Sequence, residues 1–319
     1  MTDKMPIGLA GLGLMGSSIA TAILAAGHPV TAIVLHISEK EEATKRITDF
    51  LLQMQEENLL KEPASQIVQR LVITTDITQL ADHSVIIESI TENLQQKKKL
   101  YADLEKVIAP GAIIGSNTSA LPVSTLQSDL QHPQRLIGIH WAEPAHITRF
   151  MEIICGGKTD IENAHKIMAL AESWGKEPSL LKKDIRGFIT NRVMYAMLRE
   201  AFHLVENGYA TVEDVDRSLR NDLGYWITFA GPFRFMDITG IPAYLTVMKD
   251  LFPELDNSAS APATIEKLVT AGARGTANAK GFYSYTHESA EQWEKLFVQF
   301  SYEIRKLAEK YPQNAGDLS

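Results

Sequence analysis

The chain has 319 residues, 45% of them hydrophobic and 22% charged, and a formal net charge of -8 at pH 7. This length exceeds what one hydrophobic core usually serves, so we expect two domains. The negative charge argues against nucleic acid or an anionic membrane surface as the main partner. The single cysteine, Cys155, excludes an internal disulfide framework, and no stretch reaches the roughly 18 uncharged apolar residues that cross a bilayer. We therefore expect a cytoplasmic globular protein.

Short apolar runs alternate with helical patterns in the first half of the chain, which is typical of a parallel sheet with crossover helices. The expected strands are residues 6–10, 31–35, 71–74, 85–89, 113–116, 136–140, 151–155 and 179–182. Long helical patterns lie between some of them, at residues 39–60 and 94–108. We predict an α/β fold with a Rossmann-type, doubly wound and mainly parallel sheet over residues 1–185.

After residue 185 the sequence pattern changes from alternating strands and helices to helices. An amphipathic pattern runs from residue 188 to 207 and ends at Gly208, a suitable residue for a helix C-terminus. Thr211 with Asp214 three residues later resembles a capping box and predicts the start of another helix. Residues 186–319 are therefore expected to form a C-terminal all-α domain.

Residues Gly11-Leu-Gly13-Leu-Met-Gly16 directly follow the first expected strand and open a helical pattern. This strand–turn–helix setting makes the glycine spacing a strong prediction of dinucleotide binding, and a plain strand-to-helix connection is the alternative. Gly11 permits the tight turn, Gly13 lets a pyrophosphate approach the backbone, and Gly16 lets the helix pack closely on the strand. The first helical residues, Leu14 and Met15, then offer backbone N–H groups and the positive end of the helix dipole to the phosphates.

An acidic residue about 20 positions further along usually binds the ribose 2′-hydroxyl of NAD. Residues 34–38 read Val-Leu-His-Ile-Ser, so His36 stands roughly where this acid is expected, and the first acid is Glu39. Without a carboxylate there, the main repulsion against a 2′-phosphate is removed, and Ser38 and Lys40 are able to contact one. We expect NAD as the cofactor, with NADP as an open alternative.

His140 and Glu152 lie in two apolar runs and are equidistant from His146. If these runs form an antiparallel hairpin that turns near His146, the two side chains lie opposite each other on one face of the sheet. A carboxylate that faces an imidazole orients the ring, fixes its tautomer and raises its basicity, as a general base requires. A purely structural hydrogen bond between the two is the alternative.

Several segments together resemble the L-3-hydroxyacyl-CoA dehydrogenase superfamily over nearly the full chain. They are residues 11–16, 88–93 with Lys97, 116–119, 138–140, 187–192, 231–233 and 280–283. The resemblance implies an NAD(P)-dependent, reversible oxidation of an L-3-hydroxy substrate to its 3-keto product, a reaction of fatty acid metabolism. It also implies that the helical domain binds the substrate and forms a homodimer.

The same resemblance implies roles for single residues. His140 matches the catalytic base of the family, and Glu152 matches the carboxylate paired with it. Ser119 matches the serine that hydrogen-bonds the 3-oxygen of the substrate, and Asn191 matches an asparagine that contacts the substrate from the start of the second domain. Three further residues are expected at the cofactor: Glu92, Lys97 and Asn117. No metal is expected.

The residues after His140 depart from the family pattern, which is usually two apolar residues followed by Asn-Pro. Here the sequence Trp141-Ala-Glu143-Pro144 replaces that asparagine with a carboxylate, which only accepts hydrogen bonds when ionised. If Glu143 faces the substrate, it disfavours a nearby anionic group and favours a cationic or polyhydroxylated substrate. If it does not, Glu143 is a solvated loop residue, paired with Arg149 across the hairpin.

Two segments leave the branch of the superfamily open. Residues 221–232 resemble the branch with L-gulonate 3-dehydrogenase, lambda-crystallin and carnitine dehydrogenase, which uses small 3-hydroxy acids, whereas residues 280–283 resemble the acyl-CoA branch. An acyl-CoA dehydrogenase and a free-acid dehydrogenase are thus both candidates. The rival classes are a non-catalytic crystallin-like protein and an enzyme of the 6-phosphogluconate or 3-hydroxyisobutyrate type, which relies on a lysine. The retained His140 and Glu152 argue against the first, and residues 116–119 and 138–140 against the second.

Overall fold

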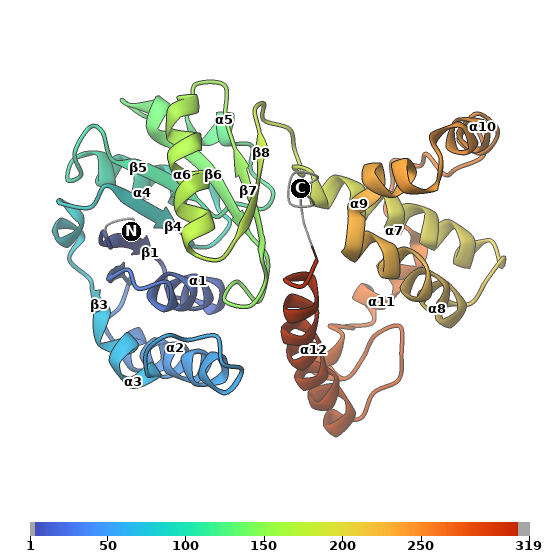
Figure 1. Cartoon of the computed structure of the whole chain (residues 1–319), viewed down its shortest axis with the longest axis horizontal. Coiled ribbons are helices and arrows are strands. Elements are labelled where there is room, and N and C mark those ends of the chain that lie inside the picture. Colours follow the sequence, from blue (N-terminus) through green and yellow to red (C-terminus); the bar gives the residue numbers. More distant parts are fainter. Residues whose placement is uncertain (1–3, 312–319) are drawn as a thin grey trace. The chain divides into compact units, whose positions relative to one another are not determined.

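The structure, a computed structural model, describes residues 4–311. The chain divides into two compact units, one that ends at Asn191 and one that begins at Arg192, which we call unit 1 and unit 2 (Figure 1). The division falls in the first turn of helix α7 (Thr190–Glu206), a few residues after the boundary expected at residue 185.

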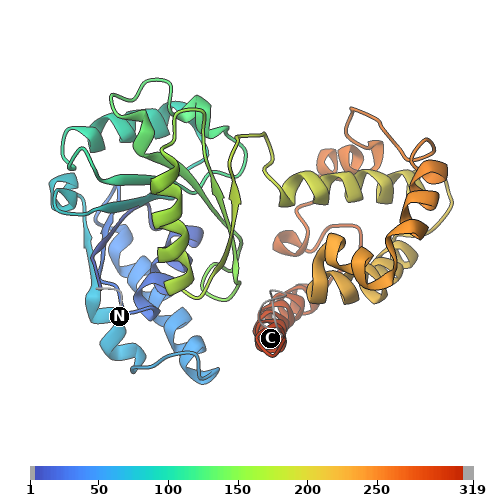
Figure 2. The ribbon, with the colours of Figure 1, turned by 45° about the horizontal axis from the view of Figure 1, so that its top comes forward.

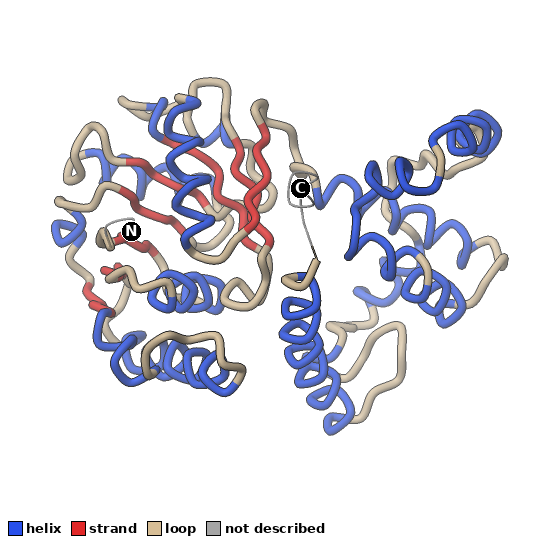
Figure 3. Tube along the Cα trace, viewed as in Figure 1, coloured by secondary structure: helices blue, strands red, loops and turns tan. Residues whose placement is uncertain are grey.

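Unit 1 is built on a sheet whose strands are drawn in red in Figure 3. The sheet has eight strands in the order β3-β2-β1-β4-β5-β6-β7-β8. The strands are β1 Ile7–Ala10, β2 Val30–Ile33, β3 Leu71–Thr74, β4 Val85–Glu88, β5 Ile113–Ser116, β6 Leu136–Trp141, β7 Phe150–Ile154 and β8 Glu177–Leu181. Neighbouring strands from β3 across to β6 are parallel, β7 is antiparallel to β6, and β8 is parallel to β7. The prediction of a doubly wound, mainly parallel sheet is confirmed.

Helices cover both faces of this sheet (Figure 2). Those of unit 1 are α1 Leu14–Ala25, α2 Glu39–Glu56, α3 Ala64–Ile67, α4 Leu94–Glu105, α5 Val123–Leu126 and α6 Ile161–Ser173, with 3-10 turns at Val68–Arg70, Ile77–Leu80 and Pro133–Arg135. Apolar residues of α1, α2 and α6 form one core with the sheet, and those of α4 and α5 form the other. Because both faces are covered, the central strands are buried along their whole length, including the polar residues Glu88 and Ser116 at the ends of β4 and β5.

Helix α2 ends at Glu56 rather than at the expected residue 60. Asn58 adopts the left-handed conformation with φ 59°, and the N–H of Leu59 bonds back to the carbonyl of Met54. This pattern closes a helix, and Asn is the residue after Gly that adopts it most readily. Helix α4 likewise stops at Glu105 instead of residue 108, shortly before Pro110. A proline disfavours helical backbone in the residue before it.

Residues 192–311 are all α, as predicted. Their helices are α7, α8 Val212–Asn221, α9 Leu223–Thr239, α10 Ile241–Leu251, α11 Ala263–Thr270 and α12 His287–Ala308, with a 3-10 turn at Thr276–Asn278. The expected end of α7 is confirmed, because Gly208 is left-handed with φ 73° and Tyr209 donates its N–H to the carbonyl of Leu204. Thr211 begins α8 by accepting the N–H of Asp214 at 3.1 Å.

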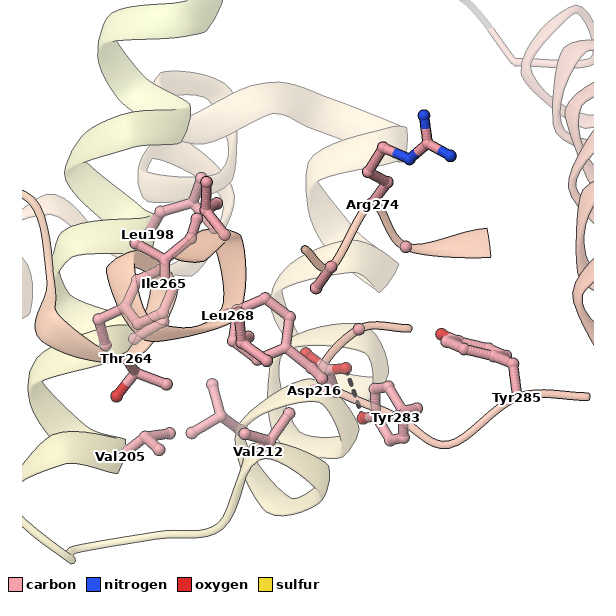
Figure 4. Close-up of a pocket in the computed structure, with 18 residues that line it drawn as sticks. Leu198, Val205, Val212, Asp216, Thr264, Ile265, Leu268, Arg274, Tyr283 and Tyr285 are labelled. Atoms are coloured by element: carbon pink, nitrogen blue, oxygen red, sulfur yellow. Dashed lines mark hydrogen bonds between the residues drawn. The ribbon is translucent and has the colours of Figure 1, made fainter. Parts of the chain in front are cut away.

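Unit 2 buries few of its side chains by itself. Within residues 192–311, only Val215, Ala290 and Tyr302 are buried. An apolar cavity of about 510 Å³ lies among α7, α8 and α11 (Figure 4). None of the helices described in either unit has both the length and the apolar character that would let it cross a membrane.

Candidate active site

The glycine-rich loop joins β1 to α1 as expected. Gly11 has φ 96°, and a side chain there would place its Cβ 2.5 Å from the carbonyl oxygen of Ser89. A Cβ on Gly16 would lie 2.1 Å from the carbonyl oxygen of Gly11, so the helix approaches the loop only because this residue has no side chain. Nothing lies within 4 Å of a Cβ built on Gly13, the N-cap of α1, which leaves open space above the loop. The three glycines therefore form a cradle that fits a dinucleotide.

The start of α1 supplies the rest of this cradle. Leu14 is exposed, Met15 is half-buried, and the first turn of the helix contains no acidic residue. Its positive dipole end therefore faces the cradle without a competing carboxylate. Arg46 of α2 adds a positive charge that the sequence did not point to. Its guanidinium donates to the carbonyl of Leu12 and to the Ser17 hydroxyl, both at 3.2 Å.

The end of β2 lacks a free carboxylate. The strand stops at Ile33, Val34 is buried, and the side chain of His36 is exposed. The first acid, Glu39, accepts the backbone N–H of His36 at 2.8 Å and so closes the turn into α2. The residues directly after β2, 34–38, therefore offer no carboxylate to a ribose.

The β6–β7 hairpin brings together the two residues expected to form the catalytic pair. His140 and Glu152 are directly paired in the antiparallel register, and Nδ1 of His140 lies 2.9 Å from Oε2 of Glu152. The predicted hairpin, which turns around His146, is confirmed. His146 itself is buried, with Nδ1 2.8 Å from the hydroxyl of Ser18, so the turn is fixed to helix α1.

Glu152 is almost fully buried and accepts hydrogen bonds on both oxygens. Oε1 accepts the backbone N–H groups of Ile189 and Thr190 at 3.0 and 2.9 Å, where α7 begins. Burial by itself would raise the pKa of Glu152, but the hydrogen bonds from His140, Thr190 and Ile189 outweigh burial and hold this pKa below its ordinary value. Glu152 is therefore ionised at neutral pH.

An ionised carboxylate only accepts, so the proton in the His140–Glu152 hydrogen bond belongs to Nδ1. In the neutral imidazole the lone pair is then on the opposite nitrogen, Nε2, and no residue within 4–311 forms a hydrogen bond with it. The rings of Phe150 and Phe188 flank the imidazole, each with its centroid 5.5 Å away. This geometry is suited to accepting a proton at Nε2.

Ser119 lies in a loop that a single carboxylate holds. Oε1 of Glu92 accepts the Thr118 hydroxyl at 2.5 Å and the backbone N–H groups of Ser119 and Ala120 at 3.0 Å. The Ser119 side chain is exposed. The backbone carbonyl of Ser119 accepts a weak hydrogen bond of 3.4 Å from the side-chain amide of Asn191. Ser119 and Asn191 are thus neighbours, although 72 residues separate them in the chain.

Asn117 joins the ends of three strands. Its side-chain oxygen accepts the N–H of Trp141 at 3.1 Å, and its amide donates to the hydroxyl of Ser89 at 3.2 Å. Because both amide groups are used within the protein, Asn117 links the loops after β4, β5 and β6.

Lys97 was expected to line the cofactor cleft, but its side chain is 0% exposed. Its ammonium lies 2.6 Å from Glu88 and 3.1 Å from Glu92. Tyr101 and Ser116 donate to the other oxygen of Glu88 at 2.6 and 2.7 Å. Lys97 therefore lies beneath the site and supports the Glu92 that holds the Ser119 loop. Glu88 begins the segment 88–93 that carries the family resemblance, but the sequence analysis assigns no role to this residue.

Glu143 is exposed at the turn of the hairpin. Arg149 does not pair with it, because the guanidinium of Arg149 binds Glu177 at the start of β8. The expectation of a Glu143–Arg149 pair is therefore wrong, and the carboxylate of Glu143 is left in a solvent-exposed loop.

Residues 280–283 make contacts within unit 2. The hydroxyl of Tyr283 donates to Asp216 at 2.7 Å (Figure 4), which raises the pKa of Tyr283 to about 12. Phe282 lines the apolar cavity. None of the expected site residues lines this cavity. Within the described residues, this segment makes its contacts inside unit 2.

Comparison with known proteins decides the family. Residues 6–185 match the model of the 3-hydroxyacyl-CoA dehydrogenase NAD binding domain, and residues 187–285 match the model of the C-terminal domain of the same enzymes. The chain belongs to the 3-hydroxyacyl-CoA dehydrogenase family. It is an NAD-dependent dehydrogenase, so the predictions of the superfamily, the enzyme class and NAD as the cofactor are confirmed.

Individual relatives differ in substrate. A 5-formyl-3-hydroxy-2-methylpyridine 4-carboxylate 5-dehydrogenase of Mesorhizobium japonicum is 31% identical over 95% of this chain and 98% of its own length. A probable 3-hydroxybutyryl-CoA dehydrogenase of Bacillus subtilis is 31% identical over 88% of this chain and 98% of its own. A solved structure of a pyridine-carboxylate dehydrogenase with the first of these activities, described as an NAD+ dependent dismutase, is similar with a TM-score of 0.89 and 28% identity over 96% of this chain and 99% of that chain. The (S)-3-hydroxybutyryl-CoA dehydrogenase of Ralstonia eutropha is similar with a TM-score of 0.73 and 27% identity over 88% and 99%.

Proposed function

We propose that His140 is the general base of a reversible oxidation of an L-3-hydroxy substrate to its 3-keto product. The observation that carries the proposal is the arrangement around the imidazole. Nδ1 is held by the buried, ionised Glu152, and Nε2 is left as a proton acceptor. In the oxidative direction Nε2 takes the hydroxyl proton, and Glu152 stabilises the imidazolium that forms. NAD, when bound in the cradle of Gly11, Gly13 and Gly16, supplies the hydride acceptor.

Ser119 and Asn191 hold the reacting oxygen of the substrate and its neighbour. Support comes from their contact with each other and from the three hydrogen bonds by which Glu92 fixes the Ser119 loop. A donor held in this way loses little freedom on binding, so its hydrogen bond to a developing oxyanion is available without reorganisation. Lys97 acts indirectly, through Glu92.

A small substrate without CoA is the second candidate. The relative that matches 95% of this chain is named for a pyridine carboxylate rather than for a thioester. If the exposed Glu143, which replaces the family's asparagine, faces the substrate, its carboxylate also disfavours a polyanionic substrate. A role in fatty acid metabolism follows only if the acyl-CoA candidate holds.

Initial rates distinguish these candidates. Acetoacetyl-CoA, a panel of small 3-hydroxy acids and the formylpyridine carboxylate of the relative are each tested with NAD and with NADP. Turnover of a member of either class, lost in the His140→Gln variant, supports the proposal. A protein that binds NAD but turns over no member of either class is the crystallin-like alternative and overturns it.

We also propose that the chain forms a homodimer in the cytoplasm. The dimer is supported by the apolar side chains that unit 2 leaves uncovered. Trp293, Leu296, Phe297, Phe300 and Leu307 follow one stripe of α12 and are all exposed. The cytoplasmic location is supported by the single cysteine, Cys155, which is buried and unpaired.

A further inference from the structure

We propose that Phe188 is a positioning residue for the His140–Glu152 pair. It acts in two ways, through its aromatic ring and through its left-handed backbone. The inference rests on the proposed role of His140 as the base, and it goes beyond that role because it names the device that holds both members of the pair.

The backbone at this position is unusual. Gly187 and Phe188 are consecutive residues with positive φ, 84° and 52°. Glycine adopts this region without cost, whereas a bulky aromatic residue rarely does. Only two other non-glycine residues within 4–311, Asn58 and Ala279, have a positive φ. A strained residue of this kind persists only where its surroundings hold it, and such residues cluster at functional sites.

The left-handed conformation of Gly187 and Phe188 orients the start of α7 toward the carboxylate of Glu152. Directly after this pair of residues, the N–H groups of Ile189 and Thr190 both point at Oε1 of Glu152, at 3.0 and 2.9 Å. Glu152 is thereby fixed on one oxygen by the backbone that follows Phe188 and on the other by Nδ1 of His140. The position of the carboxylate therefore depends on the turn at residues 187–188.

The ring of Phe188 acts on the other member of the pair. It is 1% exposed and belongs to the core between the sheet and helices α4 and α5, which also includes Ile154 and Leu181. Its centroid lies 5.5 Å from the imidazole of His140 at an interplanar angle of 59°, and Phe150 lies at the same distance from the imidazole at 89°. The rings of Phe150 and Phe188, which belong to different segments of the chain, restrict the imidazole to few rotamers. In the observed rotamer Nδ1 faces Glu152 and Nε2 points away from it.

A change at this turn is therefore expected to reduce turnover more than binding. Misplacement of a catalytic group by about 1 Å costs roughly 100-fold in rate even when the substrate still binds. The cradle for the cofactor lies in the loop after β1, which β4 and β5 separate from β6 in the sheet, so NAD affinity is expected to stay unchanged.

Two variants test the two actions separately. Phe188→Leu keeps an apolar side chain and removes the flat ring, whereas Gly187→Ala keeps the ring and disfavours the left-handed turn. Gly208→Ala is the matched control, because Gly208 has φ 73° at the other end of α7 and nothing lies within 4 Å of its added Cβ. For each purified full-length variant, kcat, KM, NAD affinity and urea unfolding are measured. The exchange of the His140 Nδ1–H is followed by ¹⁵N NMR, with the signal assigned by its loss in His140→Gln.

We expect Phe188→Leu and Gly187→Ala each to lower kcat by at least about tenfold, with NAD affinity unchanged and faster exchange of the Nδ1–H. Gly208→Ala should lose stability without losing kcat. The proposal is overturned if both test variants keep wild-type kcat and Nδ1–H exchange, or if their losses match that of Gly208→Ala. Wild-type turnover of the His140→Gln variant would instead overturn the proposed role of His140 as the base. Failure of the Phe188 proposal and failure of the proposed function are therefore distinguishable.

Discussion

At the scale of single residues, the pairing of His140 with Glu152 gives the two ring nitrogens of His140 different roles. Nδ1 is occupied by the buried carboxylate at 2.9 Å, which leaves Nε2 for the substrate. Replacement of His140 by Gln keeps a polar side chain and removes the base. We expect turnover to fall by roughly 10²–10⁴, with NAD binding unchanged, and Glu152→Gln to cost less in the same direction. Steady-state kinetics and cofactor titration check this, and near-normal turnover of His140→Gln would contradict the mechanism.

Glu152 also predicts a pH dependence of stability. Its hydrogen bonds hold its pKa in the folded protein below the ordinary value of 4.5. A group whose folded pKa is depressed contributes stability above its unfolded pKa and loses that contribution as pH falls through the folded pKa. In Glu152→Gln this contribution is absent, so the free energy of unfolding should fall less steeply below pH 4.5 than in the wild type. Urea unfolding over a pH series measures both slopes, and equal slopes would show that Glu152 does not contribute.

Glu143 provides a test of substrate choice. Its carboxylate is exposed and is not used by Arg149. If it faces the substrate, Glu143→Asn should raise activity on acetoacetyl-CoA and shift the acidic limb of the pH–rate profile to lower pH, because a negative charge near the imidazole is removed. Arg149→Gln, which breaks the pair with Glu177 instead, is the control. An unchanged substrate ranking together with an unchanged limb would make Glu143 a loop residue only.

At the scale of elements, the end of β2 sets the contact with the ribose. Glu39 closes the turn by binding the backbone of His36, and residues 34–38 contain no carboxylate. Discrimination against NADP should therefore be weak, about tenfold or less, which corresponds to about 1.4 kcal/mol. His36→Asp should sharpen the preference for NAD. Kinetics with both cofactors measure the ratio, and a wild-type preference beyond about a thousandfold would show that Glu39 binds the ribose after all.

The elements of unit 1 were predictable to different degrees. Strands of a parallel sheet are buried on both faces, so each appears in the sequence as an apolar run, and all eight were recognised. The ends of helices depend on single residues whose backbone conformation is not visible in the sequence. Asn58 ends α2 by adopting φ 59°, which many asparagines do not. The left-handed Phe188 was equally invisible, although it lies inside a segment that marks the family.

At the scale of the whole molecule, unit 2 predicts association. Its helices expose apolar side chains, among them Trp293 at 58% and Phe297 at 58%. Apolar stripes of this size usually mark an interface. Phe297→Asp should convert a dimer into a monomer, whereas Lys295→Asp, on a different face of α12, should not. Sedimentation equilibrium measures the result, and a wild-type monomer at micromolar concentration would exclude the homodimer.

The sequence by itself determined the fold class, the dinucleotide cradle, the pairing register of His140 with Glu152 and the family, because these depend on local spacing. Only the tertiary structure decided which groups meet across the chain. It showed that Lys97 is buried beneath the site, where it pairs with Glu88. It also showed that Arg149 pairs with Glu177 and that the backbone at the start of α7 donates a hydrogen bond to Glu152. Such contacts depend on how strands and helices far apart in the sequence are packed together. Composition and spacing do not record that packing, so the substrate-facing side chains are the part of the site that the sequence determines least.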